Sequence, residues 1–287
     1  MRTLYDVPAP AKLNLFLHIT GRRHDGYHLL QSAFMLIDWC DLLDFELRPD
    51  GQISREDLEG SVPCDDLCTR AARLLQTRTG CTRGVHIGLR KRLPAQAGMG
   101  GGSSDAASTL LALNRLWGLQ LPLSTLLELG LQLGADVPFF LQGRNAWVEG
   151  IGEKITPLSG AAALPPQRWI VVKPTAGLDT SRIFSAPDLK RDTNSATIAG
   201  FAAAHYDFGR NDLQSVAEAL CPDVTTALQW LELRGLQGRM TGSGSAVFAR
   251  ISHDWTVGDI PDGWQVKTCD NLSLHPLAGW APEKIEG

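Results

Sequence analysis

The sequence predicts an α+β protein of two domains, and three observations favour this fold class. Apolar residues alternate over several short segments, as in strands, and recur at helical spacing over others. Both patterns occur in each half of the 287-residue chain. Between the halves, residues 150–167 are rich in Gly, Ala and Pro and poor in large apolar side chains. We therefore expect domains over residues 1–155 and 156–287.

The expected elements follow from these patterns. In residues 11–19 the leucines point to one side of a strand, while Lys12 and Asn14 point to the other. Asp50-Gly51 between two alternating runs predicts a hairpin. Further strands are expected over 42–47, 52–54, 85–89, 169–172, 246–249 and 264–268, and helices over 65–76, 105–117, 123–133 and 205–230.

The composition is that of a folded protein with balanced charge. Hydrophobic residues make up 44% of the chain and charged residues 20%, which excludes a disordered chain. The net charge of -4 argues against a broad surface for nucleic acid or anionic membrane. Three basic residues at 90–92 are the local support for a nucleic-acid-binding module, and a phosphate environment or a solvated strand end explains them better.

Signals for export or for a structural metal do not stand out. The first eight residues lack the apolar core of a secretory signal, and no run of about 18 apolar residues occurs, so we expect a soluble cytoplasmic protein. The six cysteines are scattered without zinc-site spacing, which predicts reduced thiols.

The most informative segment is the glycine-rich stretch at 93–104, directly before a predicted helix. Glycines let backbone N–H groups approach an anion, and a helix start adds unpaired donors, so phosphate is the natural guest. A flexible turn without a ligand is the alternative. Ser103 and Ser104 could cap the helix or reach a phosphate or its Mg²⁺. The lysine of the Gly-x4-Gly-Lys loop and the third glycine of the dinucleotide loop are missing.

A second glycine cluster, at 240–249, leads into an apolar strand of the other half. A tight turn explains this cluster equally well when it is taken alone. Together, the two glycine clusters indicate a cleft between the halves.

Three segments, in this order and spacing, resemble the signature motifs of the GHMP small-molecule kinases: 10–17, 94–104 and 240–249. Residues 21–28, 133–140 and 211–213 most resemble the branch of that superfamily that acts on 4-diphosphocytidyl-2-C-methyl-D-erythritol.

The resemblance implies a fold and a reaction. It implies an N-terminal ATP-binding domain with a left-handed βαβ feature, a ferredoxin-like C-terminal domain and an active site between them. The implied reaction uses ATP and Mg²⁺ to phosphorylate the 2-hydroxyl of that cytidyl diphosphate compound, in the non-mevalonate route to isoprenoid precursors.

The resemblance also implies roles for individual residues. Asp136 matches the catalytic Asp, and Lys12 matches the Lys that contacts it and the reacting hydroxyl. Ser104 is the candidate contact for Mg²⁺. The implied substrate contacts are Asn14, Tyr27, His28, Asp136, Thr180 and Phe184, and the implied ATP contacts are Pro94, Ala95, Gln96, Ala97, Gly98, Met99, Gly100, Gly101, Gly102, Ser103 and Ser104.

Other interpretations stay open at this point. Without the resemblance, Asp136 reads as a turn or capping residue and Lys12 as a solvated strand residue. Asp66 stands where the family often has Asn near the adenine pocket. Residues 95–97 are poorer in glycine than the same stretch of some relatives. The rival functions are a GHMP kinase for another alcohol, such as homoserine or mevalonate, and a catalytically silent nucleotide-binding protein.

Overall fold

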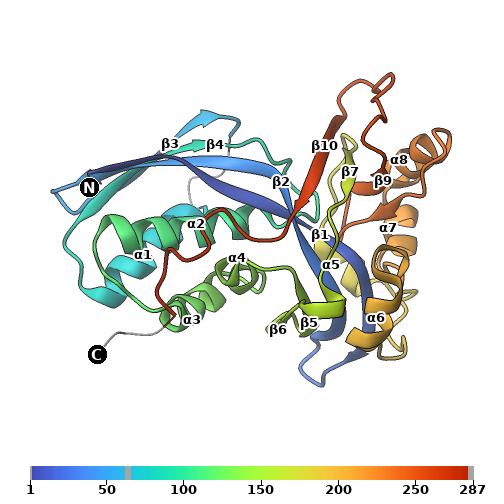
Figure 1. Cartoon of the computed structure of the whole chain (residues 1–287), viewed down its shortest axis with the longest axis horizontal. Coiled ribbons are helices and arrows are strands. Elements are labelled where there is room, and N and C mark those ends of the chain that lie inside the picture. The colour runs from blue at the N-terminus through green and yellow to red at the C-terminus, as the bar shows by residue number, and fades with distance from the viewer. Residues whose placement is uncertain (1, 62–65, 284–287) are drawn as a thin grey trace.

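The computed structural model describes residues 2–61 and 66–283. Cys64 and the first residue of the helix expected over 65–76 lie outside the described residues. The molecule has two lobes that share long strands (Figure 1). Within the described part of the chain, no helix combines the length and apolarity needed to cross a bilayer.

A mixed sheet runs through both lobes in the order β3-β4-β2-β10-β7-β9-β8, with β1 and β5 also paired to β2, and β6 to β5. The antiparallel pair β1 and β2 forms its long central ribbon. The strands are β1 Thr3–Arg22, β2 His28–Arg48, β3 Ile53–Glu59, β4 Gly84–Arg90, β5 Ala146–Gly150, β6 Lys154–Pro157, β7 Arg168–Lys173, β8 Arg239–Met240, β9 Val247–Ile251 and β10 Gln265–Leu272.

Helices pack in both lobes. In Figure 1, α1 to α4 gather below the sheet of one lobe, while α5 to α8 belong to the other lobe. The helices are α1 Leu67–Thr79, α2 Gly101–Leu116, α3 Leu123–Leu133, α4 Val137–Gln142, α5 Thr180–Ser185, α6 Ile198–Ala204, α7 Gln214–Leu220 and α8 Pro222–Glu232. Helix α3 has the bounds that the sequence predicts.

The hairpin predicted at Asp50-Gly51 is wrong. Strand β3 does not pair with β2, because β4 lies between them, antiparallel to β2 and parallel to β3. Helix α1 joins β3 to β4, so these elements form a βαβ unit. The turn sequence correctly indicates a chain reversal, but turn chemistry does not determine which strand becomes the neighbour.

The continuous helix predicted over 205–230 is also wrong. The chain leaves helical geometry after Asp207 and resumes it at Gln214. Gly209, with a φ of 63°, lies against β1, where an added Cβ would come within 2.9 Å of Phe16 Cβ. The intervening segment therefore packs on β1, and this tertiary contact overrides the helical periodicity.

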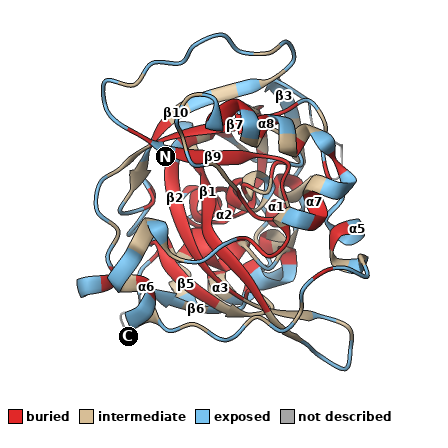
Figure 2. Ribbon diagram, turned by 90° about the vertical axis from the view of Figure 1, so that its right-hand side faces the viewer, coloured by how far each residue is buried: buried red, intermediate tan, exposed pale blue. Residues whose placement is uncertain are grey.

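Among the described residues, the hydrophobic core comprises three clusters, and β1 contributes to each of them. Val7 and Ala9 belong to the first cluster, Leu13 to a central one, and Leu17 and Ile19 to that of the second lobe. Figure 2 shows β1 and β2 buried over most of their length. Both faces of β1 are buried between Ala9 and Ile19, so the side carrying Lys12 is not a solvated one.

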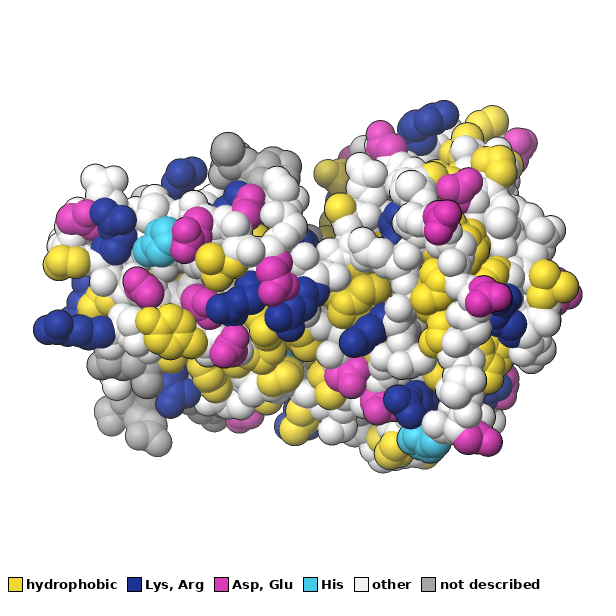
Figure 3. Space-filling view, turned by 90° about the horizontal axis from the view of Figure 1, so that it is seen from above, with side chains coloured by type: hydrophobic (Ala, Val, Ile, Leu, Met, Phe, Trp, Pro, Cys, Tyr) yellow, Lys and Arg dark blue, Asp and Glu magenta, His cyan; other side chains and the backbone are white. Residues whose placement is uncertain are grey.

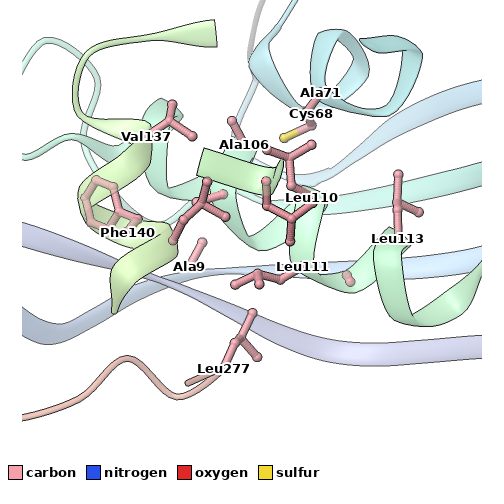
Figure 4. Close-up of a cluster of buried hydrophobic side chains, with 14 of the residues drawn as sticks. Ala9, Cys68, Ala71, Ala106, Leu110, Leu111, Leu113, Val137, Phe140 and Leu277 are labelled. Atoms are coloured by element: carbon pink, nitrogen blue, oxygen red, sulfur yellow. The ribbon is translucent and has the colours of Figure 1, made fainter. Parts of the chain in front are cut away.

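The C-terminal segment returns to the first lobe. Leu277 and Ala281 belong to the first hydrophobic cluster, and Leu123 N donates a hydrogen bond to Pro282 O at 2.8 Å. Figure 4 shows Leu277 beneath Leu111 and Ala9. The first lobe thus contains residues from both ends of the chain. The domain boundary expected after residue 155 stays a prediction.

Candidate active site

The glycine-rich loop runs directly into α2, which begins at Gly101, four residues before the predicted start. Gly100 is the N-cap with a φ of 71°, and no side chain hydrogen-bonds the cap position. An added Cβ at Gly100 would come within 3.0 Å of the Phe140 ring. The first-turn N–H groups of a 16-residue helix thus follow a loop whose backbone is closely packed, which suits anion binding.

The two glycine clusters touch each other. An added Cβ at Gly98, whose φ is 71°, would lie 2.2 Å from Thr241 O. An added Cβ at Gly242 would lie 2.7 Å from Gly98 O. Ser245 N also donates a hydrogen bond to Gln96 O at 3.1 Å. The motif of the second half therefore supports the glycine loop of the first half.

Two cavities adjoin at this loop. One, of about 380 Å³, lies on the side of α1 and α2 and is lined by Leu67, Lys91 and most of the loop. The other, of about 630 Å³, lies on the side of β1 and reaches α5. Gln96, Gly98 and Gly100 line both cavities, so the glycine loop forms their common wall.

Lys12 and Asp136 line the second cavity together. Lys12 Nζ lies 3.7 Å from Asp136 Oδ2, and it donates hydrogen bonds to Asn14 Oδ1 at 2.5 Å and Gly98 O at 3.1 Å. Three acceptors around one nitrogen suit the three donors of an ammonium. Burial lowers the pKa of Lys12, and the charge of Asp136 opposes that shift.

Asp136 is positioned by a sharp change of direction between two helices. Helix α3 ends at Leu133 with Gly134 as its C-cap, and Asp136 is the N-cap residue of α4. Its side chain makes no cap hydrogen bond and is 30% exposed, toward the cavity that it lines. The capping role considered from the sequence is therefore absent, and the carboxylate is available to a ligand.

Asn14 connects Lys12 to both halves. Its Nδ2 donates to Ser32 Oγ at 2.9 Å, and its backbone N donates to Thr241 Oγ1 at 2.9 Å. These contacts fix the amide so that Oδ1 accepts from Lys12. Asn14 thus lines the cavity and orients the ammonium.

The two loop serines differ in position. Ser103 lines the first cavity. Ser104 is fully buried, and its hydroxyl donates to Pro10 O at 2.7 Å. The hydroxyl of Ser104, the residue selected from the sequence for Mg²⁺, thus tethers α2 to β1, whereas Ser103 is among the residues that line the cavity.

Two of the four predicted base-binding residues, Phe184 and Thr180, line the second cavity. The His28 ring packs against the Phe184 ring with centroids 5.1 Å apart and an interplanar angle of 34°. Tyr27 is 61% exposed and does not line either cavity. The structure therefore places His28 against the cavity-lining Phe184, which lies on the same helix as Thr180, and leaves Tyr27 outside both cavities.

Asp66 lines the first cavity and caps α1. Its carboxylate accepts from Cys68 N at 2.5 Å and Thr69 N at 3.0 Å, and it pairs with Arg55. The carboxylate is thus engaged by its own helix and by a cation. Asn and Asp cap helices equally well, so the ion pair with Arg55 is what gives this departure from the family pattern a structural reason.

The site also contains residues that the sequence does not single out. Ser243 lines the second cavity and shares a hydrogen bond of 2.7 Å with Thr180. Lys91 lines the first cavity, where its ammonium bridges Asp41 at 2.5 Å and Asp105 at 2.7 Å. The basic run at 90–92 was the available signal for Lys91, while only the fold brings its carboxylate partners together.

The charge distribution on the surface agrees with the balanced composition. Acidic and basic side chains are interspersed over the face drawn in Figure 3, without a continuous basic surface there. All three residues of the basic run at 90–92 are paired with carboxylates: Lys91 with Asp41 and Asp105, Arg90 with Asp44 and Arg92 with Glu59.

Comparison with known proteins agrees with this geometry. The family of GHMP kinases N terminal domains matches residues 66–144, and that of GHMP kinases C terminal domains matches residues 189–261. A 4-diphosphocytidyl-2-C-methyl-D-erythritol kinase of Paracidovorax citrulli is 69% identical over 99% of this chain and 100% of its own length. One of Verminephrobacter eiseniae is 64% identical over 99% and 100%.

Solved structures show the same fold. A crystal structure of 4-(cytidine 5'-diphospho)-2C-methyl-D-erythritol kinase is 32% identical, with a TM-score of 0.75 over 92% of this chain and 98% of that one. A homoserine kinase from Cytophaga hutchinsonii has a TM-score of 0.66 at 14% identity, covering 96% and 95%, and shares the fold. The chain therefore belongs to the GHMP kinases and, within them, to the family of 4-diphosphocytidyl-2-C-methyl-D-erythritol kinases.

Proposed function

We propose that this protein transfers the γ-phosphoryl group of ATP to the 2-hydroxyl of 4-diphosphocytidyl-2-C-methyl-D-erythritol, giving the 2-phosphate and ADP in the non-mevalonate isoprenoid pathway. One observation carries the proposal: Lys12 and Asp136 lie 3.7 Å apart in a cavity that shares its wall with the glycine-loop cavity. A nucleotide on one side of that wall and an alcohol on the other would meet at the loop.

The chain's own groups suit the proton transfer. Asp136, with a carboxylate that caps nothing, accepts the proton of the acceptor hydroxyl. Lys12, held by Asn14 and Gly98, orients that oxygen and stabilises the negative charge that develops on it. Phosphoryl transfer relies mainly on such positioning and charge stabilisation.

The triphosphate would lie along the glycine loop and the start of α2, where backbone N–H groups supply donors. Two residues beside the loop carry oxygen donors of the kind that Mg²⁺ prefers, and Mg²⁺ keeps several waters as well: Ser103, which lines the first cavity, and Asp136, which lines the second. When bound, Mg²⁺ neutralises charge on the phosphate oxygens. Ser104 would serve by holding α2 against β1.

The cytidyl end of the acceptor would occupy the part of the second cavity that α5 lines. Phe184 offers an aromatic face there, and His28 packs beside that ring. A volume of about 630 Å³ is in the range of small-molecule sites. Small alcohols such as homoserine would leave this aromatic end unused.

The proposal is tested by offering ATP and Mg²⁺ with three alcohols in turn: the cytidyl diphosphate compound, homoserine and mevalonate. We expect ADP release with the first alone, and a new phosphomonoester on the 2-position by ³¹P NMR. ADP release with homoserine or mevalonate instead would support another GHMP kinase activity. No release with any of them would contradict the proposal.

A further inference from the structure

The loop after α5 contains an arginine whose five N–H groups are all used within the protein. Arg191 follows Phe184 by seven residues and reaches back to the β1–β2 turn. Its Nε donates to His28 Nε2 at 3.0 Å. Its two terminal nitrogens donate to the carbonyl oxygens of Phe184 at 3.2 Å, Ala186 at 2.7 Å, Pro187 at 3.4 Å and Leu189 at 2.9 Å.

This arrangement determines which ring nitrogen of His28 carries the proton. A guanidinium has five donors and no acceptor. His28 Nε2 must therefore accept the hydrogen bond from Arg191 Nε, and the proton of the neutral ring must lie on Nδ1. Nδ1–H is then the donor that this ring can offer to a ligand.

The charges around His28 favour the same neutral form. Burial lowers the pKa of His28, and the cations of Arg191, from the loop after α5, and Arg22, from the end of β1, lower it further. A proton added to Nε2 would also face the N–H of Arg191. Protonation of His28 at low pH would therefore weaken the hydrogen bond between Arg191 Nε and His28 Nε2.

The same guanidinium holds the partner ring of His28. By binding the carbonyl of Phe184 and those of the following residues, it closes the end of α5 into a turn. Phe184 lines the second cavity and packs on His28. The Arg191 side chain thus contacts both Phe184, which lines the cavity, and His28, whose ring packs on Phe184.

We propose that Arg191 is a positioning residue for the base-binding end of the site, which fixes His28 as the neutral Nδ1–H tautomer and holds Phe184 beside it. This inference rests on the proposed function for the identity of the ligand. It adds a residue that does not line the cavity and acts through Phe184, which does, and through His28, which packs on Phe184.

The first test needs no substrate. In protein labelled with ¹⁵N-histidine, with His28 assigned by comparison with the His28→Gln variant, we expect Nδ1 to be protonated and Nε2 unprotonated at neutral pH. In Arg191→Met, the Nε2–H tautomer should become populated and the pKa of His28 should rise, because a cation and a donor are removed. An Nε2–H or charged His28 in the unchanged protein would overturn the proposal.

The second test is kinetic. Arg191→Met should raise the KM for the cytidyl substrate about tenfold, with kcat and the KM for ATP within about twofold of the unchanged protein. Arg191→Lys keeps the charge but has three donors, so its KM for the cytidyl substrate should lie between those of Arg191→Met and the unchanged protein. The matched control is Lys190→Gln, which removes the neighbouring exposed cation, paired with Asp192, and should change none of these values.

The two proposals fail in different ways. If the cytidyl compound is not a substrate, the proposed function fails, while the ¹⁵N spectra still decide the tautomer and its dependence on Arg191. If the compound is a substrate but its KM is unchanged in Arg191→Met, or the substrate KM does not follow the altered titration of His28 with pH, the positioning role is wrong.

Discussion

At the scale of single residues, the site depends on polar groups that the fold leaves without a structural task. Asp136 is the clearest case, because it occupies an N-cap position and yet makes no cap hydrogen bond. Lys12 shows the complementary feature, a buried ammonium with three oxygen neighbours. Desolvating such a group costs free energy, so its retention at a cavity wall points to chemistry rather than to stability.

The Asp136→Asn variant tests this view. It keeps the shape of the side chain and removes the proposed base, so the rate of ADP release should fall at least about a hundredfold, with the KM for ATP little changed. Steady-state kinetics with a circular dichroism spectrum would check both points.

A matched control is Asp223→Asn, which replaces a carboxylate in the first turn of α8 that lines neither cavity. Its turnover should stay near that of the unchanged protein. Near-normal turnover in Asp136→Asn would rule out the carboxylate as general base.

At the scale of elements, the sequence predicts strands and helices well where periodicity alone determines them. Helix α3 and strands β1, β4 and β7 fall where the alternation or the helical spacing indicates. The pairing of β3 with β4 and the break before α7 could not be predicted, because both depend on which distant segment packs there.

The same distinction holds for the site. The glycine clusters are visible in the sequence as local composition, and the resemblance to a kinase family supplies Lys12 and Asp136. The hydrogen bonds of Arg191 with His28, and of Ser243 with Thr180, join positions 163 and 63 residues apart, so no local pattern indicates them.

A prediction at this scale concerns the contact between the two glycine clusters. In Gly98→Ala, the new methyl group would lie 2.2 Å from Thr241 O, so the loops must separate and the common wall of the cavities must deform. We expect the KM for ATP to rise at least about tenfold and the melting temperature to fall by several degrees.

The control for this variant is Gly235→Ala. Gly235 has nearly the same φ, 73°, but an added Cβ meets nothing within 4 Å. Both variants therefore pay the left-handed backbone cost of about 1–2 kcal/mol, and only Gly98→Ala adds the clash. Equal KM values for ATP in the two variants would show that the loop contact does not shape the nucleotide site.

At the scale of the whole molecule, the two lobes are joined by strands that run through both of them. Strand β1 contributes side chains to all three hydrophobic clusters, and β10 pairs with β2 through Leu272 and Leu36. The C-terminal segment then returns to the first lobe. Because the lobes share strands and core residues, neither lobe can unfold without disrupting the packing of the other.

The Leu277→Ala variant separates this view from one of two independent lobes. Leu277 is 3% exposed in the first cluster, and losing its side chain should lower the free energy of unfolding by about 2–5 kcal/mol. If unfolding is one cooperative event, slow hydrogen exchange should accelerate by the same factor in β4 and in β9, which lies in the other lobe. The control is Leu233→Ala: the Leu233 side chain is 86% exposed, so this variant should leave the rate of hydrogen exchange in both strands unchanged. Faster exchange in β4 alone would instead mean that the lobes unfold separately, and that the shared strands tie them together less strongly than their packing indicates.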